Sequence, residues 1–571
     1  MYDETIINDH FNLPISYLNK KETLNKDIVT DLELTEVHNE DCKPIYHELF
    51  KPNDAISKQV CNQWSKYYTN DVIFLKDSKN LYKKIEFNNE INNNEKFSQE
   101  WFLIMNNNDF LTKYHFVDFK YLLSFNTNAK FLCYLSIYNI TSPVIALLSP
   151  IIILIIPFII LKLKGVPVNV KEYKRTISEI MGKHAIGNFF KNFNKVGLNK
   201  KFYLIFSLAF YCFQMYQNCM SCRTFYKNQK EIHTFFDETK TYIKNTIKNM
   251  EHYLTCSENL SSYKSFNKDV IKNKTILESH YNRLNKLIDM QYNLSFYKNI
   301  NQIGRLMREF HRTRYDDSLK SSLLFSLGFN GYVSNVCELK KLLKNKNVNF
   351  CKFTNNKLKF NDILYPSLHN NPDVVKNDVV IDKNYLITGP NAAGKTTIIK
   401  TVLLNIIFSQ QMGLGFYKSA SINPFKYLHC YINIPDTSSR DSLFQAEARR
   451  CKNIIENVNS DPECTHFCLF DELYSGTNPD EASASAYAFI DYLTKNNNVK
   501  FILTTHFIDV CEKLDSNNNI KNFHMETELK NNKLCYNYKI TEGISKTKGG
   551  LEVLKQMQYP ENLINKAKTF K

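Results

Sequence analysis

The segment that most limits the possible folds of this chain is 384-NYLITGPNAAGKTTIIK-400, which contains a G-x-x-x-x-G-K-[ST] motif. A short apolar run at residues 385–388 precedes the motif and is typical of a buried strand, and an amphipathic run follows Lys395. Glycines let backbone N–H groups converge on phosphate oxygens, and the following helix directs its positive end at the same anion. The segment therefore predicts a site for the phosphates of a nucleotide.

Each residue of the motif has an expected role. Lys395 is expected to reach the β- and γ-phosphates, and the hydroxyl of Thr396 to bind Mg²⁺. The residues expected to line the nucleotide site are Gly389, Pro390, Asn391, Ala392, Ala393, Gly394, Lys395, Thr396 and Thr397. The sequence thus predicts ATP and Mg²⁺ as cofactors.

Two further apolar runs end in residues suited to phosphoryl transfer. The segment 465-THFCLFDELYSGTNPDEA-482 places Asp471 and Glu472 at the end of one strand, and 499-VKFILTTHF-507 places His506 at the end of another. We expect Asp471 to hold Mg²⁺ together with Thr396, Glu472 to orient and polarise the attacking water, and His506 to sense the γ-phosphate. Lys395, Glu472 and His506 are thus the predicted catalytic residues of an ATPase.

The segment before the acidic strand distinguishes between classes of ABC-type ATPase. A transporter ATPase would carry a glycine-rich LSGGQ-like sequence there and Pro after the catalytic Glu, where this chain has Leu473. Instead, 440-RDSLFQAEARR-450 places Ser442, Phe444 and Glu447 in an S-x-F-x-x-E spacing. Together with GPNAAGKT, LFDELYSGT and TTHF, this segment resembles the MutS family of DNA mismatch-repair ATPases.

That resemblance is strong over residues 355–570 and looser over residues 223–345. It implies that Ser442 reaches the nucleotide of a second subunit, so that a homodimer or heterodimer encloses ATP, and that Asp436 neighbours the phosphates. It also implies DNA as a partner. However, no mismatch-reading GxFYE-like segment occurs in residues 1–130. The expectation is a divergent member without a visible mismatch-reading domain.

Two uncharged stretches predict contact with a membrane. Residues 131–161 carry no charge, and the 19 residues of 143–161 are numerous enough to cross a bilayer as a helix. A second stretch, residues 202–222, is more polar towards its end. Between them, residues 162–201 hold ten Lys or Arg against two Glu, a net charge of +8 out of +16 for the chain.

Such a basic segment normally stays on the cytoplasmic side, where an ATP site must also lie. We therefore expect a hairpin that enters one leaflet and returns, with the basic segment on anionic headgroups. A single crossing by residues 131–161 is the alternative, and a buried core helix is the third interpretation of each stretch.

The expected fold is an α/β P-loop ATPase domain, ABC-type and MutS-like, at residues 351–571. An all-α lever region is expected at 223–350, a hydrophobic membrane-associated hairpin at 131–222, and an α-rich N-terminal region of unknown role at 1–130. The expected function is ATP-dependent dimer closure coupled to DNA binding at or near a membrane, as in mismatch repair. The expected location is membrane-associated with the ATPase facing the cytoplasm, the nucleus being left open. The alternative is an ATP-gated, membrane-bound switch or scaffold that does not recognise mismatched DNA.

Overall fold

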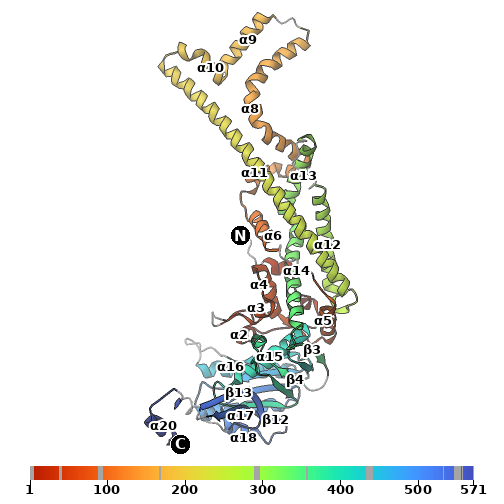
Figure 1. The fold of residues 1–571 in the computed structure, drawn as a ribbon, viewed down its shortest axis with the longest axis vertical. Coiled ribbons are helices and arrows are strands. Elements are labelled where there is room, and N and C mark those ends of the chain that lie inside the picture. The colour runs from red at the N-terminus through yellow and green to blue at the C-terminus, as the bar shows by residue number, and fades with distance from the viewer. Residues whose placement is uncertain are drawn as a thin grey trace. The chain divides into compact units, whose positions relative to one another are not determined.

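The computed structural model describes most of the chain (Figure 1). The described residues are 6–37, 42–87, 94–165, 169–287, 296–354, 358–432, 442–530, 533–545, 554–555 and 557–569. They form two compact units. The first takes in residues 94–247 and 275–323, and the second takes in residues 6–87, 248–274 and 324–569.

A six-stranded sheet lies at the centre of the C-terminal part of the second unit, in the order β13-β12-β6-β11-β10-β9. All neighbouring strands are parallel except β13, which is antiparallel to β12. The bounds are β6 Asn384–Thr388, β9 Tyr427–Tyr431, β10 His466–Asp471, β11 Val499–Thr504, β12 Ile520–Lys530 and β13 Lys533–Glu542. Every residue of β6 is buried, and β10 is buried up to Asp471. Such continuous apolar runs are typical of parallel strands covered on both faces. The strands predicted before the glycine loop, the acidic pair and the histidine are therefore confirmed.

Helix α15 follows the glycine loop and is apolar around most of its circumference. The helices of this region are α15 Lys395–Met412, α16 Leu443–Ser460, α17 Pro479–Thr494, α18 Ile508–Leu514 and α20 Glu561–Thr569. Fifteen of the eighteen residues of α15 are buried, so it is a core helix rather than an amphipathic surface helix. It lies between Gly394 and Gly413, whose φ angles of 91° and 73° are left-handed and favour glycine.

A second sheet has five strands in the order β5-β4-β8-β3-β7. The bounds are β3 Val348–Phe353, β4 Leu358–Ile363, β5 Asn377–Ile381, β7 Leu414–Phe416 and β8 Ser419–Ile422. Strands β4 and β5 pair in antiparallel register, with an irregularity between Phe360 and Ile363. The connection from β4 to β5 contributes one wall of the cavity described below.

The N-terminal helices pack against the end of α15. Their bounds are α1 Ile7–His10, α2 Lys26–Asp31, α3 Ile45–Phe50, α4 Ala55–Asn62 and α5 Val72–Lys84, and β1 Glu22–Thr23 pairs with β2 Tyr67–Tyr68. The buried amide of Gln411 accepts from the Tyr46 hydroxyl at 2.7 Å and donates to the carbonyl of Trp64 at 2.6 Å. Gln410 donates in the same way to the carbonyl of Thr69 at 3.1 Å. These bonds satisfy two amides that would be costly to bury alone.

The described part of the first unit is helical. Its helices are α6 Asn94–Met105, α7 Phe110–Lys113, α8 Ala129–Leu163, α9 Val170–Lys183, α10 Ala185–Asn192 and α13 Phe296–Tyr315. It also holds parts of α11 Leu198–Ser257, α12 Lys264–Asn285 and α14 Asp317–Leu343. Phe97 stacks on Tyr242 at 4.1 Å, and the buried carboxylate of Glu309 pairs with Arg283 and Arg308 at 3.1 and 3.0 Å. Helices α11 to α14 occupy most of residues 223–350, where helices were expected.

Two helix pairs organise the first unit. Helix α13 packs on α8 at Gly304, where an added Cβ would lie 2.1 Å from the carbonyl oxygen of Ala129. Helices α8 and α11 run in opposite directions, and the hydroxyl of Tyr211 on α11 donates to the carbonyl of Ala146 on α8 at 3.4 Å (Figure 1). Helices α9 and α10 lie between them in the chain, so α8 and α11 form a helical hairpin.

The prediction of a transmembrane helix is not supported. Among the residues that the structure describes, no helix has the length and apolar character needed to span a bilayer. In α11 the physical reason is visible, because Gln214, Gln217 and Asn218 interrupt the apolar run at residues 202–222. The alternative of a single crossing by residues 131–161 is likewise not supported.

Candidate nucleotide site

The glycine loop between β6 and α15 has the backbone of a phosphate-binding turn. Gly389 and Gly394 have φ angles of 155° and 91°, and Ala392 also has a positive φ of 63°. A Cβ at position 394 would lie 3.2 Å from the ring of Tyr538. Glycine is therefore needed there for two reasons, the left-handed backbone and the close approach of an aromatic ring.

Lys395 lies at the centre of the site. Its side chain is buried, and its Nζ donates to the carbonyl of Gly389 at 3.0 Å. The same nitrogen is 3.0 Å from Nε2 of His506 and 3.7 Å from a carboxylate oxygen of Glu472. Burial lowers the pKa of Lys395, whereas the carboxylates of Glu472 and Asp471 act in the opposite direction. A cation held in this way gains a strong partner when an anion enters the loop.

Glu472 and His506 face each other across the ends of β10 and β11. Nε2 of His506 is 3.0 Å from Oε1 of Glu472, and this hydrogen bond is the main reason that the pKa of Glu472 is lowered. The same Nε2 contacts Lys395, so it accepts from the lysine when unprotonated or donates to Glu472 when protonated. Glu472 has a φ of 53°, a left-handed conformation that is uncommon for residues other than glycine and is found at functional sites.

Thr396 and Asp471 supply two oxygen ligands of the kind that Mg²⁺ prefers. The hydroxyl of Thr396 donates to Oδ2 of Asp471 at 2.7 Å, and the hydroxyl of Thr504 bonds the other carboxylate oxygen. Among the described residues no group of three or more His, Cys, Asp or Glu is arranged to hold a metal ion. One hydroxyl and one carboxylate fit the usual protein share of a Mg²⁺ shell that is completed by phosphates and water.

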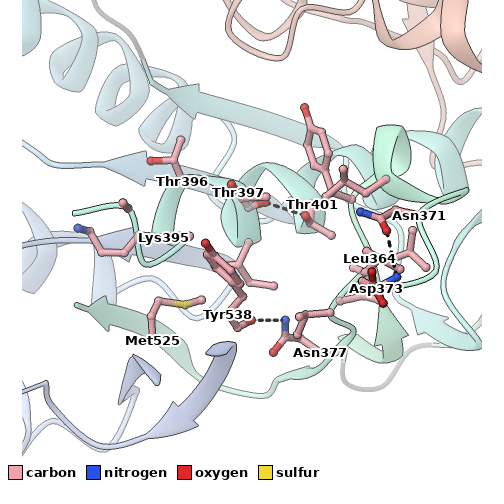
Figure 2. Close-up of a pocket in the computed structure, with 18 of the residues that line it drawn as sticks. Leu364, Asn371, Asp373, Asn377, Lys395, Thr396, Thr397, Thr401, Met525 and Tyr538 are labelled. Carbon is pink, nitrogen blue, oxygen red and sulfur yellow. Dashed lines mark hydrogen bonds between the residues drawn. The ribbon is translucent and has the colours of Figure 1, made fainter. Parts of the chain in front are cut away.

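A cavity of about 540 Å³ extends from this cluster (Figure 2). At one end it is lined by Lys395, Thr396 and Glu472, and at the other by both apolar and polar residues of the β4–β5 connection, including Leu364 and Asp373. That connection includes the LYPSL segment at residues 364–368. Tyr538 of β13 lies against the cavity, and its carbonyl accepts from the amide of Asn377 at 3.0 Å. The volume is in the range of small-ligand sites, with a lysine at one end and a mixed apolar and polar wall at the other.

Sequence reasoning did not select Tyr538 as a site residue. The only local signal is an aromatic residue in a strand, which is common, because its place beside the glycine loop depends on the pairing of β12 with both β6 and β13. Met525 of β12 lines the cavity for the same reason. Both residues become visible as site residues only when the sheet order is known.

Ser442 caps helix α16 and does not line the described cavity. Its hydroxyl accepts from the N–H of Gln445 at 3.3 Å, and the Gln445 side chain accepts from the N–H of Ser442 at 3.0 Å. This is a capping box, which leaves the serine exposed at the helix N-terminus. Asp436 lies outside the described residues.

Glu447 of the same helix is buried and is tied to the loop after the acidic pair. Its carboxylate accepts from the N–H and hydroxyl of Ser475 at 3.1 and 2.8 Å, and from the N–H of Gly476 at 3.2 Å. Phe444 packs on Tyr474 at 5.7 Å. The three residues of the S-x-F-x-x-E spacing thus act as cap, aromatic contact and buried acceptor, and they hold α16 against the end of β10.

The parallel sheet, the glycine loop and the converging Lys395, Asp471 and Glu472 define an α/β P-loop ATPase domain. A family model described as MutS domain V matches residues 385–571. This C-terminal region is therefore a MutS-type ATPase domain, and the predicted resemblance is confirmed for it.

Curated relatives agree with this assignment. The DNA mismatch repair protein MutS of Bacillus cereus (strain AH187) is 30% identical over 199 residues, which are 34% of this chain and 22% of that protein. The protein of the same name from Listeria monocytogenes serotype 4b (strain CLIP80459) is 29% identical over 197 residues, again 34% and 22%. The chain thus matches only about a fifth of the length of these relatives.

Proposed function

We propose that this chain binds ATP with Mg²⁺ in the cavity beside the glycine loop and hydrolyses it to ADP and phosphate. The observation that carries the proposal is a convergence beside that cavity of Lys395 at the start of α15, the acidic pair Asp471 and Glu472 at the end of β10, and His506 after β11. Tyr538 and the apolar side chains of the β4–β5 connection have the chemistry to pack on the adenine ring.

The chain's own residues have distinct parts in the proposed reaction. The backbone N–H groups of the glycine loop and Lys395 hold the β- and γ-phosphates, and Thr396 and Asp471 hold Mg²⁺, which neutralises phosphate charge when bound. Glu472 orients the attacking water through its carboxylate, which its lowered pKa keeps ionised. His506 contacts Glu472 and Lys395 and is placed to respond when the γ-phosphate separates them.

A turnover assay with nucleotide binding measured in parallel tests this proposal. Glu472→Gln is expected to abolish hydrolysis while ATP still binds, and Lys395→Ala to weaken binding itself. Glu512→Gln, an exposed carboxylate on α18, is the matched control and should leave both unchanged. Wild-type rates in the Glu472 and Lys395 variants would refute the assignment.

We further propose that two subunits close around ATP, with Ser442 of each reaching the nucleotide of the other, and that closure is coupled to DNA. Support comes from the exposed serine at the start of α16, from the name of the relatives as DNA mismatch repair proteins, and from the net charge of +16. Turnover should rise with duplex DNA, and DNA binding should weaken with salt. If the Glu472→Gln variant remains monomeric when ATP is bound to it, subunit closure is contradicted.

A second candidate function is an ATP-gated, membrane-bound switch that does not recognise mismatched DNA. The exposed apolar side chains of α8 and α11 favour it, because a DNA-binding surface does not require them. In this case the ATPase domain faces the cytoplasm, and anionic vesicles rather than DNA stimulate turnover.

A further inference from the structure

The hairpin of α8 and α11 exposes more large apolar side chains than a water-facing surface normally does. On α11, four phenylalanines at steps of four, four and three residues lie on one side of the helix, and their exposed fractions range from 56% to 80%. These residues, here called the phenylalanine stripe, are Phe202, Phe206, Phe210 and Phe213. On α8, Ile145, Ile156 and Leu163 are 49%, 48% and 82% exposed. Single exposed apolar residues are ordinary, but a continuous surface of them marks a binding site.

The segment between the two helices carries the positive charge. The described, exposed cations of this segment, here called the basic belt, are Lys162, Lys164, Lys171, Lys174, Arg175, Lys191, Lys195 and Lys200. Within the belt, Arg175 pairs with Glu179 at 3.4 Å, and Lys191 bonds the carbonyl of Ser178 at 2.9 Å. The sequence of residues 162–201 has only two carboxylates against ten cations, so most of the positive charge is not neutralised locally.

Contacts within the hairpin hold the belt beside the apolar surface. Phe158 of α8 packs on Tyr173 of α9 at 4.8 Å, and His184 packs on Tyr211 of α11 at 5.1 Å. Lys201 lies 5.3 Å from the ring centre of Phe193. Apolar side chains and cations are therefore fixed on the same part of the first unit, and they do not belong to separate surfaces.

We propose that this hairpin binds the surface of an anionic membrane, with the phenylalanine stripe and the exposed isoleucines of α8 inserted into one leaflet and the basic belt on the headgroup phosphates. The choice of lipid over a second copy rests on charge. A second copy would bring a like-charged belt to the same surface, which is unfavourable, whereas anionic headgroups complement the +8 of the segment. An apolar insertion and a basic patch together are the two signals that stable binding at a membrane surface requires.

The proposal rests on the second candidate function. Lipid binding is nevertheless measured in the absence of ATP, so it can be judged separately from turnover. The full-length chain is sedimented with vesicles of phosphatidylcholine alone or mixed with phosphatidylserine, and ATP turnover is measured on the same samples. Wild type is expected to bind only the mixed vesicles, and less at high salt. If turnover is absent while vesicle binding is retained, the result contradicts the proposed ATPase function but not the proposed lipid binding.

Two pairs of variants separate the apolar and charged contributions. Phe206→Ser with Phe210→Ser is expected to weaken vesicle binding by about tenfold or more. Its matched control, Phe119→Ser with Tyr121→Ser, removes two aromatic side chains that are 60% and 83% exposed outside the hairpin and should bind as wild type. The double variant Lys162→Glu with Lys164→Glu is expected to weaken vesicle binding by about tenfold or more. Its matched control, Lys268→Glu with Lys272→Glu, changes two exposed lysines on α12 and should bind as wild type.

Three results would overturn the proposal. The first is wild type remaining in solution with both kinds of vesicle. The second is equal effects of the test and control variants. The third is self-association without vesicles that the Phe206 and Phe210 changes abolish, which would make a second copy the occupant of the surface.

Discussion

Asp31 of the N-terminal helix α2 accepts a hydrogen bond from Arg450 of α16 at 2.9 Å, although 419 residues separate them in the chain. The same carboxylate accepts from the N–H of Ile432 at 3.3 Å, at the end of β9. Arg450 also donates to the carbonyl of Cys430 and lies 3.4 Å from Asp27. The N-terminal helices are thus bonded to the helix that begins at Ser442.

This pair makes stability depend on pH in an unusual direction. Burial raises the pKa of Asp31 to about 6, although Arg450 opposes the shift. Because the folded-state pKa lies above the ordinary value of about 3.9, the stabilisation is present below pH 4 and is lost as pH rises to 6. Relative to Asp31→Asn, wild type is expected to lose up to about 3 kcal/mol of unfolding free energy across that range.

Denaturant unfolding at several pH values measures this effect. Asp27→Asn removes a half-exposed carboxylate from the same helix and the same arginine. It should keep most of the wild-type pH dependence, because Asp27 makes only the smallest contribution to raising the pKa of Asp31. A parallel pH dependence in wild type and Asp31→Asn would show that the buried carboxylate does not titrate in this range.

The lowered pKa of Lys395 predicts the alkaline side of the pH–rate profile. In the free protein the ammonium loses its proton below the ordinary lysine pKa of about 10.4, because burial disfavours the charge. As pH rises, kcat/KM for ATP is therefore expected to begin its decrease at a pH lower than about 10.4. The decrease of kcat should begin at a higher pH than that of kcat/KM, because bound phosphates favour the ammonium. The two rate constants measured against pH test this, and coincident profiles would contradict it.

Removing the ring of Tyr538 should weaken ATP binding. Tyr538→Ala takes away the aromatic wall beside Gly394 and is expected to raise the dissociation constant for ATP about tenfold, since stacking of a base on an aromatic ring contributes about 1–3 kcal/mol. Tyr487→Ala, on α17 and outside the cavity lining, is the matched control. Equal affinity in both variants would place the adenine elsewhere.

Gly304 should tolerate no side chain. Gly304→Ala places a Cβ 2.1 Å from the carbonyl of Ala129 and 2.7 Å from the N–H nitrogen of Cys133, so α8 and α13 must separate. We expect a loss of about 1–3 kcal/mol in the first unit. Gly197→Ala meets no atom within 4 Å and should change stability by less than about 0.5 kcal/mol. Thermal unfolding followed by circular dichroism compares them, and equal midpoints would show that the helix contact adjusts freely.

The order of strand, loop and helix around Lys395, and the ends of β10 and β11, could be predicted because each is encoded in a few adjacent residues. Asp31, Gln410 and Tyr538 could not, since their contacts join segments far apart in the chain and no local pattern marks them. The transmembrane prediction rested on a count of uncharged residues, but no helix in the described part of the chain has both the length and the apolar character that a span needs.

The bonds of Gln410 and Gln411 have a consequence for how the protein can be divided. The last turn of the helix that follows the glycine loop ends among carbonyl groups of Trp64, Tyr67 and Thr69. A fragment beginning at residue 351 would lack these carbonyl groups and expose the amides of Gln410 and Gln411 to water. The N-terminal residues are thus a structural part of the ATPase domain. Any displacement of α15 during turnover must also displace them.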